Sequence, residues 1–445
     1  MTSGTTVAEP VAITHATLLP GDLAGSVRPR TTVLVDAHGL ISAVGPTDEI
    51  DVPPGTRTID ATHRFVLPGL INAHAHLFSD GRPLPAFLVS PRVERLALAF
   101  LHSALGRRYL RGRTKSAAIT QMNTGVTTIR SVGDPGYEVV EVGGAIERGQ
   151  YLGPRLIASG PLLAIPGGHG APQIALTATD AESTRTNVRR NLQHGVKAIK
   201  ISATAGVTDA KEIGYAGRPE MSEANMRIIC HEAHEAGVLV AAHAQSGEGI
   251  VSALRAGVDT IEHGAELSDE AIALFQHNPE SLRGFSALIP TLMACLPLVK
   301  LDRSITGANP VARANAEWVL DGMLRGIRQC LDNDIPLGMG TDSALTFVTH
   351  YNTWRELDFL IRYGGLSPAR ALHAATQGNA HILGIEQVTG AIEEGRAADL
   401  LITDADPLDD IRALARPSAV LVRGRVIDSP VVEEFPEIDR LLDDF

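Results

Sequence analysis

The sequence predicts an α/β protein in which a (β/α)8 TIM barrel carries a small β-sandwich domain built from both chain termini. Three observations support this fold class. Short β-rich runs separated by turn residues occupy the first 65 or so residues and return at the end of the chain. Between them, about eight short apolar runs each follow a helical stretch, as strands of a buried parallel sheet do. No GxGxxG motif follows any of these runs, which favours a closed barrel over an open doubly wound sheet.

The β-sandwich is expected to combine residues 1–66 with residues 388–445. Its predicted N-terminal strands are Val11–Leu19, Thr31–Asp36, Leu40–Val44 and Thr56–Asp60. Its predicted C-terminal strands are Asp399–Thr403, Ala419–Val422 and Arg425–Ile427. Pro-Gly, His-Gly and Pro-Pro-Gly sequences separate the early strands. The acidic end of the chain has regularly spaced apolar residues and predicts a short surface helix.

The barrel is expected at residues 67–387. Its predicted strands are Leu67–Ala73, Val126–Ser131, Leu156–Ser159, Val196–Ser202, Val238–Ala244, Val258–His263, Leu288–Leu292 and Ile335–Gly340. The predicted helices include Thr114–Asn123, Ala181–His194, a helix from the N-cap Ser222 to Ala236, Gly247–Ala256 and Pro310–Leu331. Gly195, Gly237 and Gly257 each end a helix directly before a strand.

Composition limits the function classes. The formal net charge of −12 argues against nucleic-acid partners, because these require a basic surface. The three cysteines are an odd number without a CxxC pair, which indicates a reducing compartment. The N-terminal MTSGTTVAEP has no basic and apolar signal-peptide pattern, and no run approaches 18 apolar residues. We therefore expect a cytoplasmic protein that acts on a small molecule, without nucleic-acid or membrane partners.

Ionisable residues occur where the predicted strands end, and in a parallel barrel the catalytic groups lie at these ends. The first strand ends in LINAHAH, whose two histidines point to the same side because side chains alternate along a strand. Four other strands also end in an ionisable side chain. The complete set is His74, His76, Lys200, His243, His263 and Asp342.

These residue types predict a metal centre. Imidazole nitrogens and one carboxylate suit zinc, with manganese, cobalt and iron as alternatives. Lys200 is an unusual neighbour for a cation, because an ammonium group repels it. Burial that lowers the pKa of Lys200 would allow the free amine to take up carbon dioxide. The resulting carbamate could bridge two divalent metals, which would share a hydroxide nucleophile.

With these residues in order, the sequence resembles the amidohydrolase superfamily across nearly the whole chain. The resemblance rests on LPGLINAHAHL, on TGVTTIRSVGD and on the closing segment ATQGNAHILGIEQVTGAIEEGRAADLLITDADPL. It is closest to the group of Xaa-Pro dipeptidases, Xaa-Arg carboxypeptidases, ochratoxin-type amidases and imidazolonepropionase-like enzymes. Asn72 stands where the family commonly has aspartate, but that position is not a ligand.

The resemblance implies roles for individual residues. His74, His76, Lys200 and Asp342 would hold the more buried metal, and Lys200, His243 and His263 the more exposed one. Asp342 would take the proton of the bridging water as general base and give it to the departing amine as general acid. His169 and Tyr215 would contact the carbonyl or carboxylate of the substrate. The family also implies a homo-oligomer.

The resemblance thus implies hydrolysis of an amide bond in a small N-acyl or peptidyl amino acid. A urea- or thiocarbamate-type hydrolase uses the same centre and remains an alternative. A mononuclear deaminase or cyclic amidohydrolase is disfavoured, because such relatives carry glutamate shortly after the histidine of the fifth strand. Here Ala244 and Gln245 follow that histidine. A non-catalytic binding protein on the same barrel is also disfavoured, because no ligand is missing.

Several other polar residues are expected to have structural roles. Arg130, at the end of the second strand, is interpreted as an ion-pair residue. His231 and His234 are three positions apart, not the four of an HExxH motif, and are assigned to helix packing or the surface. Asp259 and Glu262 flank His263 and could orient it, or could face solvent instead. The remaining histidines are treated as incidental: His15, His38, His63, His350, His373 and His381.

Overall fold

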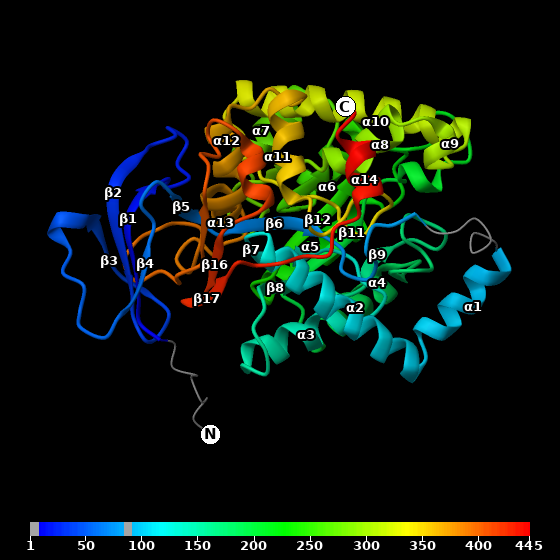
Figure 1. The fold of residues 1–445 in the computed structure, drawn as a ribbon. Helices are drawn as coiled ribbons and strands as arrows, with labels where there is room; N and C mark the ends of the chain where they lie inside the picture. The colour runs from blue at the N-terminus through cyan, green and yellow to red at the C-terminus, as the bar shows by residue number, and fades with distance from the viewer. Residues whose placement is uncertain (1–8, 84–90) are drawn as a thin grey trace.

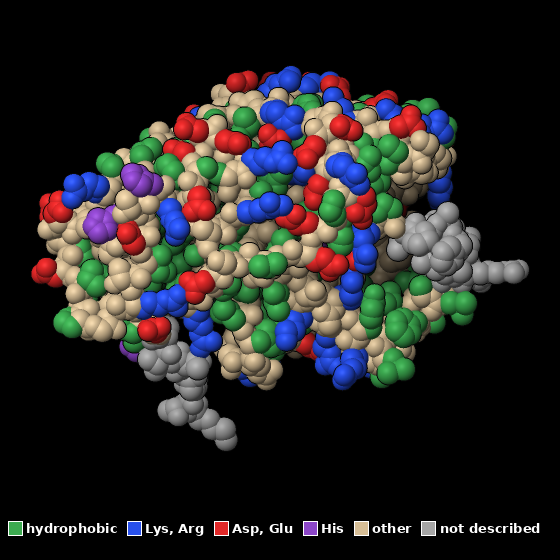
Figure 2. Space-filling view, viewed as in Figure 1, with side chains coloured by type: hydrophobic (Ala, Val, Ile, Leu, Met, Phe, Trp, Pro, Cys, Tyr) green, Lys and Arg blue, Asp and Glu red, His purple; other side chains and the backbone are tan. Residues whose placement is uncertain are grey.

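The computed structural model describes residues 9–83 and 91–445 of the chain. Figure 1 shows the N-terminal strands, in blue, at one side of the molecule, with the barrel and its helices beside them. On the face drawn in Figure 2, basic and acidic side chains are interspersed. No helix within the described ranges combines the length and the apolar character needed to cross a bilayer.

Strands from both ends of the chain form one hydrogen-bonded sheet. Its order is β17-β16-β15-β5-β1-β2-β3, and β4 also pairs with β1. The two ends meet where β5 and β15 pair antiparallel, with Val66 opposite Ile402. The strands are β1 (Val11–Leu18), β2 (Arg28–Val35), β3 (Ile41–Pro46), β4 (Arg57–Asp60), β5 (Phe65–Pro68), β15 (Leu400–Thr403), β16 (Ala419–Val422) and β17 (Arg425–Asp428). Because the hydrogen bonds assign a single sheet, the two-layer sandwich stays a prediction.

The chain is a TIM-barrel-type α/β protein. Seven parallel strands follow one another around the barrel, and each pairs with its neighbour in sequence order except at the break between β8 and β11. There, the amide of Lys197 donates to the carbonyl of Ala158 at 2.8 Å. The strands are β6 (Leu70–Ala75), β7 (Val126–Ser131), β8 (Arg155–Ala158), β11 (Ala198–Ser202), β12 (Leu239–Ala244), β13 (Thr260–His263) and β14 (Ala287–Ile289). Two further short strands, β9 (Leu162–Ala164) and β10 (Ala175–Thr177), extend the sheet beside β11.

The eighth barrel position differs from the expectation. Residues 335–340 form no regular strand, and single bridges join Leu337 to Leu288 and Ser343 to Ala75. These residues still close the ring, since the amide of Gly338 donates to Leu288 and the amide of Ala73 donates to Met339. A side chain at Gly340 would place its Cβ 2.4 Å from the Cβ of His74. Close packing against β6 therefore requires glycine in this segment.

The strand expected at Leu67–Ala73 is two strands. Pro68 ends β5 in the terminal sheet, and Leu70 begins β6 in the barrel. Gly69 lies between them, and its amide donates to the carbonyl of Asp399 at 2.8 Å. A Cβ at Gly69 would lie 2.3 Å from the side chain of Thr127. The chain thus changes from one sheet to the other at a residue that only glycine fits.

The helices agree with the sequence patterns at most boundaries. Ser222 caps α5 and Ser246 caps α6 by accepting from backbone amides three residues on. The helices are α1 (Pro91–Leu101), α2 (Ala104–Asn123), α3 (Glu138–Glu147), α4 (Ala181–Gln193), α5 (Glu223–Glu235), α6 (Gly247–Arg255), α7 (Asp269–Gln276), α8 (Leu292–Lys300), α9 (Arg303–Thr306), α10 (Pro310–Asp332), α11 (Thr353–Arg362), α12 (Pro368–His373), α13 (Asn379–Ile382) and α14 (Pro436–Leu442). A π-helical turn, Ala374–Gly378, joins α12 to α13. Short 3-10 turns are η1 (Thr47–Glu49), η3 (Val207–Asp209) and η5 (Ile411–Ala415).

One helix and one strand differ clearly from the predicted ranges. The helix expected from Thr114 begins ten residues earlier, because the Ser103 side chain caps it by accepting from Gly106. The strand expected at Leu288–Leu292 ends at Ile289. It ends early because Leu292 starts α8, where the Glu356 carboxylate accepts from the amides of Leu292 and Met293 at 2.8 Å each. The predicted C-terminal helix is present as α14.

Candidate metal centre

Three buried ligand groups meet at the carboxyl end of the barrel. His74 lies on β6, His76 directly follows this strand, and Asp342 follows the eighth segment. One carboxylate oxygen of Asp342 lies 3.2 Å from Nε2 of His74 and 3.1 Å from Nε2 of His76. One ligand atom from each residue lies within 4.8 Å of the others, a spacing that could hold a metal ion. All three residues are buried.

Backbone geometry explains how these side chains converge. His74 and His76 are two positions apart at the end of β6, so the alternation of side chains directs both to the same side. The amide of Asp342 donates to the carbonyl of His74 at 2.8 Å, which fixes the segment against β6. Asp342 has a φ of 57° and His263 a φ of 68°, left-handed values that are uncommon for residues other than glycine. Residues in such strained conformations are concentrated at functional sites.

Three of the four histidines are held through Nδ1. The Nδ1 of His74 lies 2.6 Å from a Glu262 oxygen, and that of His76 lies 2.7 Å from the carbonyl of Gly133. The Nδ1 of His263 lies 2.7 Å from the Thr291 hydroxyl. A partner at Nδ1 fixes the ring orientation and leaves Nε2 to act as a metal ligand.

Lys200 and His243 differ from these three residues, since they lack hydrogen-bond partners. Within the described part of the chain, Nζ of Lys200 and both ring nitrogens of His243 are buried without a partner. Burial lowers the pKa of Lys200 to about 8 and holds the pKa of His243 well below its ordinary value. The His243 ring lies 4.6 Å, centroid to centroid, from that of His263. Buried polar groups without partners are costly, and coordination to a metal would satisfy them. The residues present therefore fit a metal centre.

The pKa of Asp342 shows the electrostatic balance at this centre. Burial alone would raise it, but the rings of His74 and His76 hold it well below its ordinary value. Burial lowers the pKa of His263 well below its ordinary value, so this ring is neutral at neutral pH. An ionised Asp342 carboxylate and a neutral His263 ring are the protonation states that metal binding requires of these two residues.

Arg130 and Glu262 form a buried ion pair next to His74. This agrees with the interpretation of Arg130 as an ion-pair residue. A guanidinium nitrogen of Arg130 lies 2.8 Å from one Glu262 oxygen, and the other Glu262 oxygen contacts His74. The guanidinium of Arg130 also donates to the carbonyl of Ala73 and to the hydroxyl of Thr260. Burial would raise the pKa of Glu262, but Arg130 and His74 hold it well below its ordinary value. The carboxylate is thus ionised and fully occupied by its donors.

The expectation that Asp259 and Glu262 orient His263 is wrong. Glu262 contacts His74, on the opposite side of the barrel. Asp259 precedes β13 and accepts from the amides of Val240 and Leu282, and one of its oxygens lies 2.9 Å from Nε2 of His234. Asp259 therefore holds the outer helix and loops, and the partner of His263 is Thr291. Alternation along β13 directs Glu262 into the barrel interior.

His169 lies beside His243, one of the predicted metal ligands. Its ring stacks on that of His243 at a centroid distance of 4.0 Å. Its Nδ1 lies 2.5 Å from a carboxylate oxygen of Asp209, and its backbone amide donates to Glu220. The remaining ring nitrogen, Nε2, has no hydrogen-bond partner within residues 9–83 and 91–445. Asp209 thus holds the His169 ring against His243, and a contact of His169 with the substrate stays a prediction.

Tyr215 is half-buried in the loop that follows β11. Its ring has the ammonium group of Lys211 and the guanidinium of Arg218 each 6.0 Å from its centroid. The same loop packs against α10, since the side chain of Asn315 accepts a hydrogen bond from the amide of Ala216. A contact of Tyr215 with the substrate stays a prediction.

The histidines that were assigned to helix packing have that role. His234 contacts Asp259, and His231 is exposed and lies 3.8 Å from Glu235 on the same helix. His350, treated as incidental, is buried, and its Nε2 lies 2.6 Å from the carbonyl of Ser79. Asn72 also has a structural role, since its side-chain amide donates to Gln121 and Thr341.

Sequence reasoning missed Asp209 and Thr291, and it paired Glu262 with the wrong histidine. Asp209 lies 40 positions from His169, and Thr291 lies 28 positions from His263. No spacing pattern within one helix or strand connects such distant pairs. One signal was available for Thr291, because it lies near the end of the predicted strand Leu288–Leu292, where candidate site residues are expected.

Comparison with known proteins gives consistent matches across the chain. A family model described as the amidohydrolase family matches residues 65–427. The crystal structure of a provisionally assigned prolidase from Bifidobacterium longum is 48% identical, with a TM-score of 0.87, and covers 98% of this chain and 99% of that chain. Ochratoxinase from Aspergillus niger is 26% identical over 441 residues, 92% of this chain and 84% of that enzyme. Imidazolonepropionase from Symbiobacterium thermophilum is 26% identical over 393 residues, 83% of each chain.

Proposed function

This chain belongs to the amidohydrolase family, and on that premise we propose that it cleaves the amide bond of a small N-acyl or peptidyl amino acid. The family and its hydrolase relatives make it a hydrolase that acts on carbon–nitrogen bonds. The single observation that carries the proposal is the buried group of His74, His76 and Asp342. The unpartnered Lys200 and His243 support it.

Two divalent metals would divide the six residues between them. His74, His76 and Asp342 would hold one metal, and His243 and His263 the other, with Lys200 bridging both. When bound, the metals would lower the pKa of a water molecule and polarise the substrate carbonyl. Zinc suits this set of nitrogen and oxygen ligands, and manganese, cobalt and iron suit it too.

Carbamylation of Lys200 explains how a lysine can serve this centre. A lysine that stayed cationic would need a carboxylate partner, but Nζ of Lys200 has no hydrogen-bond partner among the described residues, although Glu262 and Asp342 lie near it. With its pKa lowered to about 8 by burial, Lys200 has a neutral fraction that can react with carbon dioxide. The carbamate would supply the anionic oxygens that the unmodified amine lacks.

Asp342 would move the proton of the reaction. Its carboxylate is ionised and buried and can accept a proton from the attacking water. It would then give this proton to the nitrogen of the departing amine. His169 would contact the carbonyl or carboxylate of the substrate through Nε2, with Asp209 holding its ring in place through Nδ1. Tyr215 is assigned to the same substrate contact by resemblance.

The substrate class rests on the relatives. The Bifidobacterium longum protein is provisionally a prolidase, and the Aspergillus niger enzyme is named for ochratoxin. The imidazolonepropionase match points to ring hydrolysis instead. The residues after His243 favour the first reading, because Ala244 and Gln245 leave no glutamate for a deaminase-type proton shuttle. The cytoplasm suits the three cysteines, which are all free.

Mass-spectrometric product analysis of the zinc-loaded enzyme would test the proposal. The substrate panel holds dipeptides, N-acyl amino acids, aryl amides, ureas and aminated heterocycles. Release of an amino acid or amine together with its matching acid is the expected result. Amine release from ureas alone would indicate the urea-type alternative. Ammonia released from an intact ring would overturn the proposal and the two-metal assignment.

A further inference from the structure

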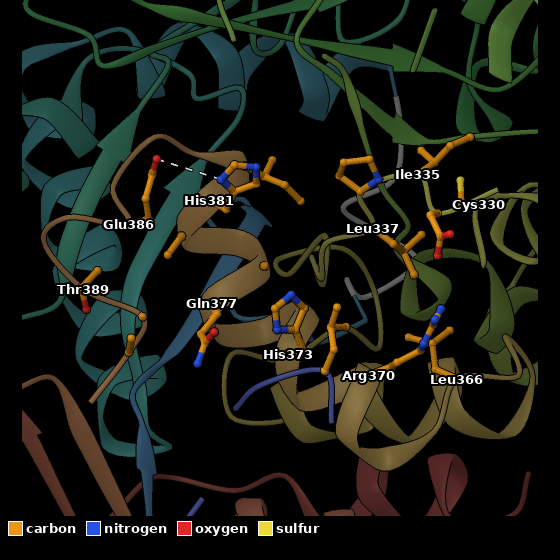
Figure 3. Close-up of a pocket in the computed structure, with 18 of the residues that line it drawn as sticks. Cys330, Ile335, Leu337, Leu366, Arg370, His373, Gln377, His381, Glu386 and Thr389 are labelled. Atoms are coloured by element: carbon orange, nitrogen blue, oxygen red, sulfur yellow. Dashed lines mark ion pairs between the residues drawn. The ribbon is translucent and has the colours of Figure 1, made fainter. Parts of the chain in front are cut away.

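A cavity of about 530 Å³ lies at the far end of the eighth barrel segment from the metal centre (Figure 3). Ile335 and Leu337, which begin this segment, line the cavity, whereas Asp342 ends the segment at the metal centre. Leu23 from the terminal sheet domain contributes to the wall, so the cavity lies where that domain meets the barrel. Its volume is within the range of small-molecule sites, which occur preferentially at such junctions.

The charges around this cavity leave one cation without a partner. The carboxylate of Glu386 is 2.8 Å from the Arg283 guanidinium, and that of Glu393 is 3.0 Å from the Arg396 guanidinium. Arg370 also lines the cavity, and among the described residues its guanidinium makes no ion pair and no hydrogen bond. The remaining lining carboxylate, Asp334, is exposed and lies outside ion-pair distance of Arg370.

The apolar part of the wall lies beside this cation. Figure 3 shows Arg370 on the side of Leu337 and Leu366, with Glu386 and His381 across the cavity from it. Leu366 is buried, and Leu337 is half-buried. One region of the cavity therefore offers an unpaired guanidinium next to an apolar surface, the combination that an amphipathic anion requires.

The wall that carries Arg370 is fixed to the rest of the protein. The π-helical turn Ala374–Gly378 follows α12 directly, and such turns are frequent at functional sites. The side chain of Gln377 donates to the carbonyl of Pro20 at 2.8 Å, and Nδ1 of His373 lies 3.0 Å from the carbonyl of Gly21. These two contacts tie the turn to the terminal sheet domain, so the cavity exists before any ligand binds.

We propose that this cavity binds a small carboxylic acid with an apolar body. The guanidinium of Arg370 would hold the carboxylate, which it can pair with through two parallel hydrogen bonds. The apolar body would lie on Leu337 and Leu366. A monoanion fits better than a phosphate ester, because Glu386, Glu393 and Asp334 also surround the cavity and would repel a second negative charge.

Isothermal titration calorimetry of the metal-loaded enzyme with hexanoate would test this site. Hexanamide, which has the same body without the charge, is the control ligand. Arg370→Gln should weaken hexanoate binding about tenfold or more, because it removes the charge-assisted hydrogen bonds. Arg108→Gln, at an exposed arginine of α2, is the matched control and should leave binding unchanged. Ala391→Phe, which fills the cavity from its lining, should also abolish binding.

Hexanoate could also bind at the metal centre, and hydrogen exchange separates the two sites. The expected result is slower amide exchange in α12 and at residues 374–378 of the wild-type enzyme, lost in Arg370→Gln. Protection limited to the strand ends around the metal centre would overturn the proposal. Equal binding of hexanoate by the wild type and Arg370→Gln, or of hexanoate and hexanamide, would overturn it as well. None of these readouts depends on amide hydrolysis, so they are independent of the proposed function.

Discussion

The metal centre has two halves that differ in how the protein supports them. His74, His76 and His263 each have a partner for Nδ1, and His74 and His76 also contact Asp342. Lys200 and His243 are buried equally well but have no partner among the described residues. The first half is complete within the protein. The second half is incomplete until something outside the chain binds to it.

This difference has an energetic meaning. An unpartnered buried polar group costs about 1–3 kcal/mol relative to a satisfied one. A folded chain tolerates such groups mainly where a ligand, metal or modification will satisfy them. We therefore expect the metal held by His74, His76 and Asp342 to bind with these residues already in place. The unsupported half should depend on the carbamate of Lys200.

The largest expected effect follows from Asp342→Asn in the supported half. The amide cannot take the proton of the attacking water, so kcat should fall by about 10⁴-fold. His74 and His76 remain, so most of the metal should stay bound. Steady-state kinetics and metal analysis of the purified variant measure both quantities. Asp334→Asn, at an exposed aspartate before the same segment, is the control. Near-normal turnover of the Asp342 variant would refute the role assigned to it.

Lys200→Met tests the unsupported half. Methionine is of similar size but cannot form a carbamate, so the metal content should fall from about two ions to about one. The loss of one Lewis acid should lower kcat by about 10²-fold. Metal content is measured by mass spectrometry, and ¹³C NMR after incubation with labelled bicarbonate detects the carbamate of the wild type. Lys197→Met, at an exposed lysine that pairs with Glu147, is the control. If Lys200→Met retained two metal ions, binding of the second metal would not depend on Lys200, and the proposed difference between the two halves would be wrong.

Glu262→Gln should weaken the contact that holds the His74 ring in its orientation. A neutral amide cannot hold Arg130 and His74 as the carboxylate does, so metal affinity should fall by about tenfold or more. Leaving the buried charge of Arg130 poorly compensated should also lower the free energy of unfolding by about 3–5 kcal/mol. Competition with a chelator and urea denaturation measure the two effects. Glu266→Gln, at an exposed glutamate, serves as control. Unchanged metal affinity would show that the Glu262 contact does not orient His74.

The smallest effect is a pH dependence of the unsupported half. With the pKa of Lys200 at about 8, raising the pH increases the fraction of neutral amine. That fraction grows about fivefold between pH 7 and pH 8, and uptake of carbon dioxide by the metal-free protein should grow with it. Initial rates of ¹³C-carbamate formation at constant dissolved carbon dioxide measure this dependence. A rate that is flat across this range would indicate an ordinary, cationic lysine.

The sequence predicted the barrel and the residues at its strand ends because both depend on local patterns. Short apolar runs that directly follow capped helices identify buried parallel strands. Polar residues at the ends of these runs identify the end of the barrel where catalytic groups lie. The boundaries that failed depend on contacts from elsewhere in the chain. Gly69 separates two sheets because of Thr127, and β14 ends early because Glu356 holds the start of α8.

The supporting contacts were harder to predict for the same reason. Glu262 lies next to His263 in the sequence, and adjacency suggested that it orients this histidine. The barrel brings it to His74, which is 188 positions away. The alternation of side chains along β13 gives its direction but does not identify the residue across the barrel. Such pairings follow from the closed ring, which one sequence alone does not specify.

The pairing of β5 with β15 has a consequence for how the protein is made. A ribosome releases β1 to β5 first, but the strand that pairs with the open edge of β5 begins at Leu400. At about 5–20 residues per second, synthesis of the intervening chain takes roughly 20 to 70 s. During that time β5 presents unpaired backbone groups, which can recruit foreign strands. The nascent N-terminal strands thus depend on chaperones, or on the growing barrel, for protection until the last strands emerge.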